Sequence, residues 1–114
     1  MTIIQQMRPI ILLGTSNYLE VVLRICKLNN FTVAGIVDSD FYGNLDQQNN
    51  IPIIGSELSF DFKSARQDHD FFIAQSMYAS DPRSREKRHK YIKLIEANDL
   101  SCASLIHPRA EIFD

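Results

Sequence analysis

The sequence predicts an α/β fold, a small Rossmann-like domain in which helices cover both faces of a parallel sheet to give three layers. Short apolar runs without polar alternation recur along the chain, and such runs are typical of strands buried on both faces. Between them lie longer segments with apolar residues at helical spacing. This alternation favours a parallel sheet with right-handed crossovers. With 114 residues, the chain is long enough for one such domain and too short for two.

The first two predicted strands flank an amphipathic helix. Residues 9–13 form a continuous apolar run that ends at Gly14, and they predict the first strand. Residues 17–30 predict a helix with a broad apolar face, and two adjacent asparagines at its end are a typical stop signal. Residues 31–37 are rich in β-branched side chains and predict the second strand.

The middle of the chain predicts a polar loop and then a short strand. Residues 43–50 are almost entirely polar, which is typical of a loop. Residues 51–55 predict the third strand, in which Pro52 indicates a strand start or a sheet edge. Residues 60–66 carry no clear pattern.

The last part of the chain predicts a strand, a helix and a final strand. Residues 69–74 predict the fourth strand. Asp81 and Pro82 predict a helix start, because Asp is a favoured N-cap and Pro is favoured in the first helical position, and this helix should run to about Asn98. Residues 101–106 predict the last strand, which a His-Pro pair ends.

Charge and hydropathy argue against two classes of partner. The formal net charge is −2, so no global electrostatic attraction draws the chain to nucleic acid or to an anionic membrane. No apolar run approaches the ~18 residues of a membrane span. Arg8 and Gly14 interrupt the first apolar stretch, which therefore does not resemble a signal peptide. We expect a cytoplasmic protein with no nucleic-acid and no membrane partner.

Metal and nucleophile motifs are also missing from the sequence. Cys26 and Cys102 lie in apolar contexts, without a close Cys or His at metal-ligand spacing, and are expected to be buried free thiols. The histidines His69, His89 and His107 form no paired metal motif, and the chain has no G-x-S-x-G elbow. We therefore expect no metal site and assign no catalytic residue.

Three loops follow the carboxyl ends of the predicted strands, which is where ligands bind in sheets of this class. They are residues 14–18, 38–43 and 75–81. In the third loop, Gln75 and Ser76 would form a polar rim of the candidate site.

The first of these loops keeps only part of a dinucleotide-binding fingerprint. That fingerprint needs glycine at its first, third and sixth positions, where this chain has Gly14, Ser16 and Leu19. The helix N-terminus still offers backbone N–H donors to an anion, and Thr15, Ser16 and Asn17 could add side-chain hydrogen bonds. The alternative is purely structural, with Gly14 turning the chain and Ser16 or Asn17 capping the helix.

Acidic residues close the second strand. Asp38 lies about 20 residues beyond the glycine loop, where a carboxylate can accept hydrogen bonds from a ribose hydroxyl, and Asp40 is a second candidate for that role. Ser39 lies between them and belongs to the same candidate site. The alternative is that these residues form a turn before Gly43 for local reasons alone.

The helix that follows Pro82 is strongly basic. Its cations are Arg83, Arg85, Lys87, Arg88 and Lys90. At helical spacing, with one glutamate among them, they are expected to form the solvated face of the helix. The exception is the first turn, from which Arg83 or Arg85 could reach a phosphate at the carboxyl edge of the sheet.

Four segments of the chain, in this order, resemble a known family. They are the strand–glycine–helix segment of residues 11–22, G-I-V-D-S-D at 35–40, I-P-I-I-G-S at 51–56 and L-I-H-P-R-A at 105–110. Together they resemble the N-terminal domain of the bacterial sugar acyltransferases typified by PglD and NeuD. The similarity covers nearly the whole chain.

The resemblance implies a function that is shared between two domains. In that family the Rossmann-like domain binds a UDP-linked amino sugar. A left-handed parallel β-helix follows, forms a homotrimer, binds acetyl-CoA and supplies a catalytic histidine. Here residues 1–104 would be the nucleotide-sugar-binding domain, and residues 105–114 would begin the linker or β-helix. The chain contains no hexapeptide repeats, so no cofactor is expected in it, and His107 matches the junction rather than the catalytic base.

The first loop departs from the family pattern. The family has two glycines and a histidine where this chain has Ser16, Asn17 and Tyr18. The backbone loses freedom at these positions and a phenol replaces the imidazole. The family ligand would therefore bind weakly or in another pose.

Three functional interpretations follow. The first is the UDP-sugar-binding domain of an acetyl-CoA-dependent sugar N- or O-acetyltransferase of surface-polysaccharide biosynthesis. The alternative is a non-catalytic binding or interaction module that kept the fold and changed the loop. A third interpretation, a small NAD-linked regulatory or epimerase-like domain, is disfavoured by the missing glycines.

We predict that the chain does not bind NAD or NADP tightly. The Cβ atom of Ser16 obstructs the approach of a pyrophosphate to the backbone, and Leu19 replaces the glycine that allows close helix–strand packing. Calorimetric titration with each dinucleotide should give no micromolar dissociation constant. A constant in that range would show that the fingerprint has been misread.

Overall fold

The computed structural model of the protein describes residues 8–15, 19–40, 42–43, 47–74 and 82–103. Over these residues the chain forms a five-stranded sheet with the order β3-β4-β2-β1-β5. The parallel strands are β1 (Ile10–Leu13), β2 (Val33–Val37), β4 (Ile51–Gly55) and β5 (Asp70–Ile73). The short strand β3 (Gln47–Gln48) pairs antiparallel with β4 at one edge.

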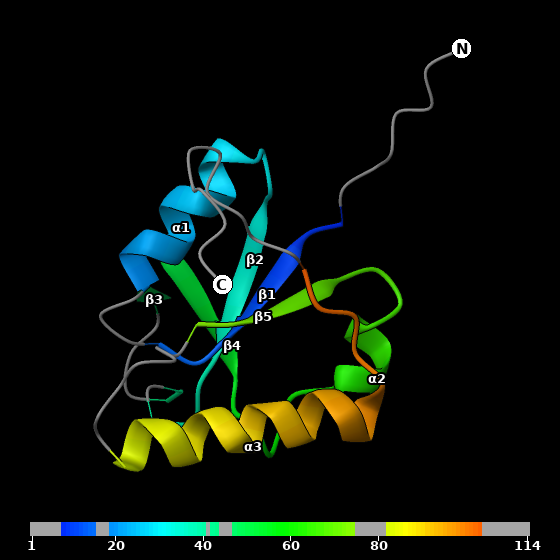
Figure 1. Ribbon diagram of the computed structural model, residues 1–114. Helices are drawn as coiled ribbons and strands as arrows, with labels where there is room; N and C mark the ends of the chain where they lie inside the picture. Colours follow the sequence, from blue (N-terminus) through cyan, green and yellow to red (C-terminus); the bar gives the residue numbers. More distant parts are fainter. Residues whose placement is uncertain (1–7, 16–18, 41, 44–46, 75–81, 104–114) are drawn as a thin grey trace, which may run out of the picture.

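Helices cover the two faces of this sheet (Figure 1). Helix α1 (Leu19–Leu28) packs on one face, and the long helix α3 (Pro82–Asn98) packs on the other. The side chains of β1 alternate between the two resulting cores, with Ile10 and Leu12 on the α1 side and Ile11 and Leu13 on the α3 side. All four are buried. The predicted α/β class and its three layers are therefore confirmed.

The boundaries of the helices agree with the local sequence signals. Helix α1 is followed by Asn30 in a left-handed conformation, with φ 61°, as the two asparagines predict. Helix α3 begins at Pro82 and ends at Asn98, although its predicted N-cap, Asp81, lies outside the described residues. The unassigned segment before β5 contains a short helix, α2 (Phe62–Ala65). The Asp61 carboxylate caps it by accepting a 3.1 Å hydrogen bond from the amide nitrogen of Ser64.

The predicted last strand is present as a single bridge within the described part of the chain. Cys102 pairs in parallel with Phe71, whose amide nitrogen donates to the Ser101 carbonyl and whose carbonyl accepts from Ala103. The remainder of that predicted strand and the predicted boundary at residues 105–114 lie outside the described residues. The expectation that both thiols are buried is wrong for Cys102, which is exposed because it lies beyond β5 at the sheet edge. Cys26 belongs to α1 and is buried against the sheet.

The segment predicted as a loop, residues 43–50, instead contains strand β3. Two asparagines, Asn49 and Asn50, connect β3 to β4 with φ of 51° and 66°. Two successive positive φ values are characteristic of a type I′ hairpin turn, and asparagine tolerates them better than most residues. The polar residues 47–50 therefore form one strand of a hairpin and its turn. Pro52 lies in this hairpin at the edge of the sheet, as predicted.

The described residues contain neither a candidate membrane span nor a candidate metal-binding cluster. None of the helices in those ranges is long and apolar enough to cross a membrane. Nor do the same ranges contain a group of three or more His, Cys, Asp or Glu side chains placed to hold a metal ion.

The β3–β4 turn makes a testable prediction. Replacing Asn50 with Ala should lower the free energy of unfolding by about 1–2 kcal/mol, because a Cβ-bearing residue without a polar side chain is strained at positive φ. Asn50→Gly is the matched control. It also removes the amide but relieves the strain, so its stability should stay within about 0.5 kcal/mol of wild type. Equal losses in chemical denaturation would contradict this account of the turn.

Candidate functional site

The carboxyl ends of β1, β2 and β4 are tied together by backbone hydrogen bonds. The amide nitrogen of Gly14 donates to the Val37 carbonyl at 2.9 Å, and that of Asp38 donates to the Gly55 carbonyl at 3.0 Å. Gly14 has φ 85°, a conformation that glycine adopts without strain, and so it turns the chain sharply out of β1. The residues that follow the three strands are therefore brought to one edge of the sheet.

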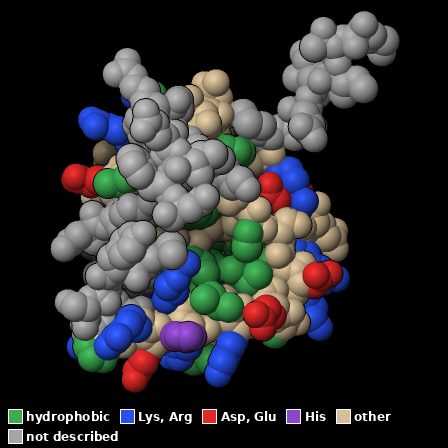
Figure 2. Space-filling view, in the orientation of Figure 1, with side chains coloured by type: hydrophobic (Ala, Val, Ile, Leu, Met, Phe, Trp, Pro, Cys, Tyr) green, Lys and Arg blue, Asp and Glu red, His purple; other side chains and the backbone are tan. Residues whose placement is uncertain are grey.

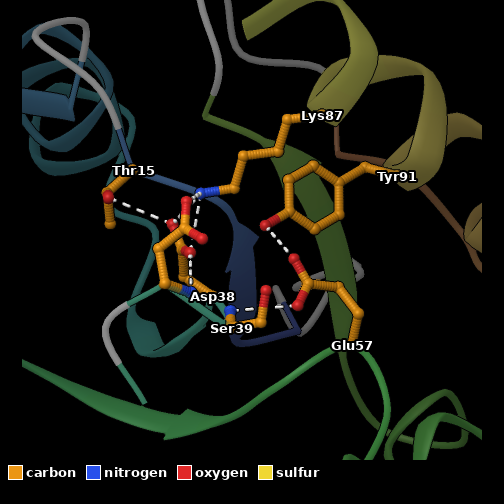
Figure 3. Close-up of polar contacts among 7 residues, drawn as sticks. Thr15, Asp38, Ser39, Glu57, Lys87 and Tyr91 are labelled. Atoms are coloured by element: carbon orange, nitrogen blue, oxygen red, sulfur yellow. Dashed lines mark hydrogen bonds and ion pairs between the residues drawn. The ribbon is translucent and has the colours of Figure 1, made fainter. Parts of the chain in front are cut away.

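A connected set of polar side chains occupies this edge, and we call it the polar cluster (Figure 3). Its members are Thr15, Asp38, Ser39, Asp40, Glu57, Lys87 and Tyr91. They come from the ends of β1, β2 and β4 and from the face of α3 that is turned to the sheet.

The carboxylate of Asp38 is at the centre of the polar cluster and is completely buried. Its Oδ1 accepts hydrogen bonds from Lys87 Nζ at 2.7 Å and from the amide nitrogen of Asp40 at 3.0 Å. Its Oδ2 accepts from Lys87 Nζ at 2.8 Å and from Thr15 Oγ1 at 3.1 Å. A buried carboxylate is tolerated only when it is paired and hydrogen-bonded in this way.

Lys87 is the cation of the polar cluster, and the prediction that it lies on a solvated face is wrong. Its side chain is only 16% exposed, and its Nζ also contacts Asp40 Oδ2 at 2.8 Å. Lys87 precedes the buried Tyr91 by four residues, so both lie on the side of α3 that faces the sheet. The sequence alone does not single out Lys87, because Arg88 and Lys90 also precede apolar residues by four positions.

The second part of the polar cluster centres on Glu57, which the sequence analysis did not single out. Its Oε2 accepts a hydrogen bond from the amide nitrogen of Ser39 at 2.9 Å, and its Oε1 accepts from the Tyr91 hydroxyl. Glu57 follows the end of β4 by two residues. The rule that site residues follow the carboxyl ends of parallel strands could therefore have identified it.

The surroundings of these groups change their proton affinities. The hydrogen bond and positive charge of Lys87 lower the pKa of Asp40. Burial alone would raise the pKa of Glu57, but hydrogen bonds from Ser39 and Tyr91 outweigh it and lower that pKa. Burial, together with the hydrogen bond to Glu57, raises the pKa of the Tyr91 hydroxyl, which stays a neutral donor. The charges of Arg83 and Lys90 on α3 contribute to the lowered pKa of Asp40 as well, after the larger effect of Lys87.

The structure brings together five of the residues proposed from sequence. They are Gly14, Thr15, Asp38, Ser39 and Asp40. Arg85 is exposed on α3. Figure 2 shows Lys and Arg side chains, with some Asp, Glu and His among them, along the lower edge of the molecule. The other proposed residues lie outside the described ones: Ser16, Asn17, Tyr18, Gln75 and Ser76.

Among the residues of the polar cluster, Asp40 offers an exposed carboxylate to a ligand without rearrangement. Asp38 is enclosed by its partners, whereas the Asp40 side chain is 59% exposed and pairs with Lys87 through one oxygen. Within the described residues, the carboxyl edge is therefore equipped to accept hydrogen bonds from hydroxyl or amine donors.

His69 lies at the opposite edge of the sheet, before β5. Its Nδ1 contacts Asp68 and the Ala65 carbonyl there.

No model of a known protein family matches the chain, and no curated protein matches it in sequence. Among solved structures, the chain is similar to PerB from Caulobacter crescentus in complex with CoA and GDP-perosamine, with 24% identity and a TM-score of 0.62. It is also similar to a mutant of perosamine N-acetyltransferase from the same organism, again with CoA and GDP-perosamine, with 22% identity and a TM-score of 0.61.

These similarities establish the fold. They cover 88% of this chain but 42% of PerB and 43% of the perosamine N-acetyltransferase mutant. The chain therefore spans less than half the length of the proteins that it resembles.

The contact between Tyr91 and Glu57 makes a prediction that combines stability and pH. Tyr91→Phe removes a donor from a half-buried carboxylate and should lower the free energy of unfolding by about 1 kcal/mol at pH 7. The folded-state pKa of Glu57 lies below its ordinary value of 4.5. Its contribution is therefore present above that value and is lost as the pH falls through the lowered pKa. The gap between wild type and variant should close over that acid range.

The measurement is chemical denaturation at a series of pH values. Tyr42→Phe, at a half-exposed tyrosine, serves as the matched control and should change stability little at any pH. A gap between wild type and Tyr91→Phe that stays constant into acid would show that Glu57 does not carry the effect.

Proposed function

We propose that this chain is a nucleotide-sugar-binding domain of the kind found in sugar acetyltransferases. The observation that carries the proposal is the polar cluster, an acidic set of acceptors at the carboxyl edge where the strand order reverses around β1. The similarity in fold to proteins solved with CoA and GDP-perosamine supports it. So does the resemblance of the sequence to the PglD and NeuD family.

The acceptors of the polar cluster suggest which part of the ligand lies against it. The carboxyl groups of Asp38, Asp40 and Glu57 supply hydrogen-bond acceptors, which suit ribose hydroxyls or base amines as donors. Asp40 is the exposed acceptor and therefore our candidate for direct contact. The sequence also suggests Asp38 as a ligand contact, and this stays a prediction. Its oxygens already accept hydrogen bonds from three partners within the protein. The diphosphate would lie toward the Gly14 turn and the start of α1.

The remaining parts of the function are proposals about a larger assembly. Acetyl transfer would need an acetyl-CoA platform and a histidine base, which the family places in a β-helix that forms a homotrimer. The reaction would be attack of a sugar amine or hydroxyl on the acetyl thioester. We propose a role in surface-polysaccharide biosynthesis in the cytoplasm, where nucleotide-linked sugars and acetyl-CoA are both supplied.

One observation favours the alternative, a binding module without a nucleotide-sugar ligand. Lys87 and Asp38 satisfy each other inside the protein, as a purely structural ion pair would. Under this alternative the polar cluster only joins α3 to the sheet. Direct measurement of ligand binding separates the two functions.

We predict weak binding of a nucleotide sugar, with a dissociation constant of about 0.1–1 mM, because the Gly14 loop departs from the family pattern. The measurement is a titration of the ¹⁵N-labelled chain with UDP-N-acetylglucosamine and, separately, with GDP-mannose, followed by amide NMR shifts. The two probes distinguish the bases. Shifts should concentrate at Thr15, Ser39 and Asp40. Binding with shifts confined to other regions would contradict the site.

Two controls accompany this titration. Asp40→Asn should weaken binding about fivefold or more, whereas Asp99→Asn, at an exposed aspartate beyond α3, should not change it. Mixing the chain with acetyl-CoA and a UDP-linked amino sugar should release no coenzyme A. Substrate-dependent release would contradict the assignment of acetyl transfer to another domain.

A further inference from the structure

Two residues on α3, one helical turn apart, hold the loops that follow two different strands. Lys87 contacts Asp38 and Asp40 after β2, and Tyr91 contacts Glu57 after β4 (Figure 3). Glu57 in turn accepts from the amide nitrogen of Ser39, so both connections from α3 converge on residues 38–40. This stretch includes the exposed acceptor, Asp40.

In the turn at residues 38–40, the positive charge of Lys87 offsets the repulsion between two carboxylates. The carboxylates of Asp38 and Asp40 both lie within 2.8 Å of the same Nζ atom. Without the ammonium that lies between them, two negative charges would be neighbours, one of them fully buried, and of the other cations acting on Asp40 only the more weakly acting Arg83 and Lys90 would remain. The Asp40 side chain would then move away, because it is the exposed member of the pair.

The contacts of Lys87 also argue against a direct role with a ligand. Its Nζ already has three carboxylate oxygens as acceptors, which matches the three donors of an ammonium, and its side chain is 16% exposed. A lysine that binds a phosphate group of a ligand would present its ammonium to the solvent instead. Lys87 is oriented inward, toward the acceptors of this chain.

We propose that Lys87 is a positioning residue, which fixes the exposed carboxylate of Asp40 in the geometry that receives the hydroxyl donors of a nucleotide sugar. This inference rests on the proposed function and assigns to α3 a part in ligand binding. Lys87 acts through Asp40 and does not touch the ligand. Tyr91 supports the same turn from the other side, through Glu57 and Ser39.

A double-mutant cycle on ligand affinity tests the proposal. Lys87→Met keeps the length of the aliphatic chain and removes the charge, and Lys93→Met at an exposed position of the same helix is the matched control. Lys87→Met should weaken nucleotide-sugar binding about tenfold in the wild-type background. In an Asp40→Asn background the same change should have an effect of less than about twofold, because the carboxylate that Lys87 positions is already gone.

A second pair of variants covers the case in which Lys87→Met alone does not fold. Replacing the buried carboxylate together with its partner, as Asp38→Asn with Lys87→Met, removes the uncompensated charge. Its affinity is then compared with that of Asp38→Asn alone, again with and without Asp40→Asn. Ligand-free amide shifts of Ser39 and Asp40 should move on loss of Lys87 and not on loss of Lys93.

The possible outcomes separate this inference from the proposed function. Equal weakening by Lys87→Met in both backgrounds would mean that Lys87 contacts the ligand. No weakening would mean that the turn at residues 38–40 keeps its geometry without Lys87. Either result overturns the positioning role and leaves the function standing. If the wild-type chain binds neither UDP-N-acetylglucosamine nor GDP-mannose, both the function and the positioning role fail.

Discussion

The arrangement of the carboxyl edge depends on the pairing of the buried Asp38 carboxylate with Lys87. A carboxylate without exposure to water needs a compensating charge and a full set of donors, and here they come from three places in the chain. Thr15 fixes the exit of β1, the amide of Asp40 fixes the turn after β2, and Lys87 fixes α3 above both. The ion pair therefore acts as a joint between the sheet and the helix layer, and it links the fold to the candidate site.

The sequence was sufficient for the layers of the fold and for part of the site, for different physical reasons. Runs such as Ile10–Leu13 and the periodicity of Leu19–Leu28 record local burial, and burial sets strand and helix type. The position of Asp38 followed from a rule about strand ends. Its partner could not be found in this way, because Lys87 is 49 residues away and looks like its basic neighbours. The strand-end rule also points to Glu57, but its contacts with Ser39 and Tyr91 depend on which strands and helix are adjacent in the fold.

Similarity in fold and similarity in ligand need not extend over the same residues. The chain shares its architecture with nucleotide-sugar acetyltransferases at 22–24% identity, which leaves most side chains at the sheet edge free to differ. In this sequence Ser16, Asn17 and Tyr18 follow Gly14, and an acidic turn paired with Lys87 follows β2. Under the proposed function these two loops would contact different parts of the ligand, and each can differ from the neighbours independently of the other.

The small hairpin formed by β3 and β4 has a consequence for association between molecules. A parallel sheet that ended in an open strand would present unpaired N–H and C=O groups to a second chain. Here β4 is covered along its first residues by β3, and Pro52 has no N–H to donate. The hairpin therefore disfavours edge-to-edge polymerisation on the β4 side of the sheet.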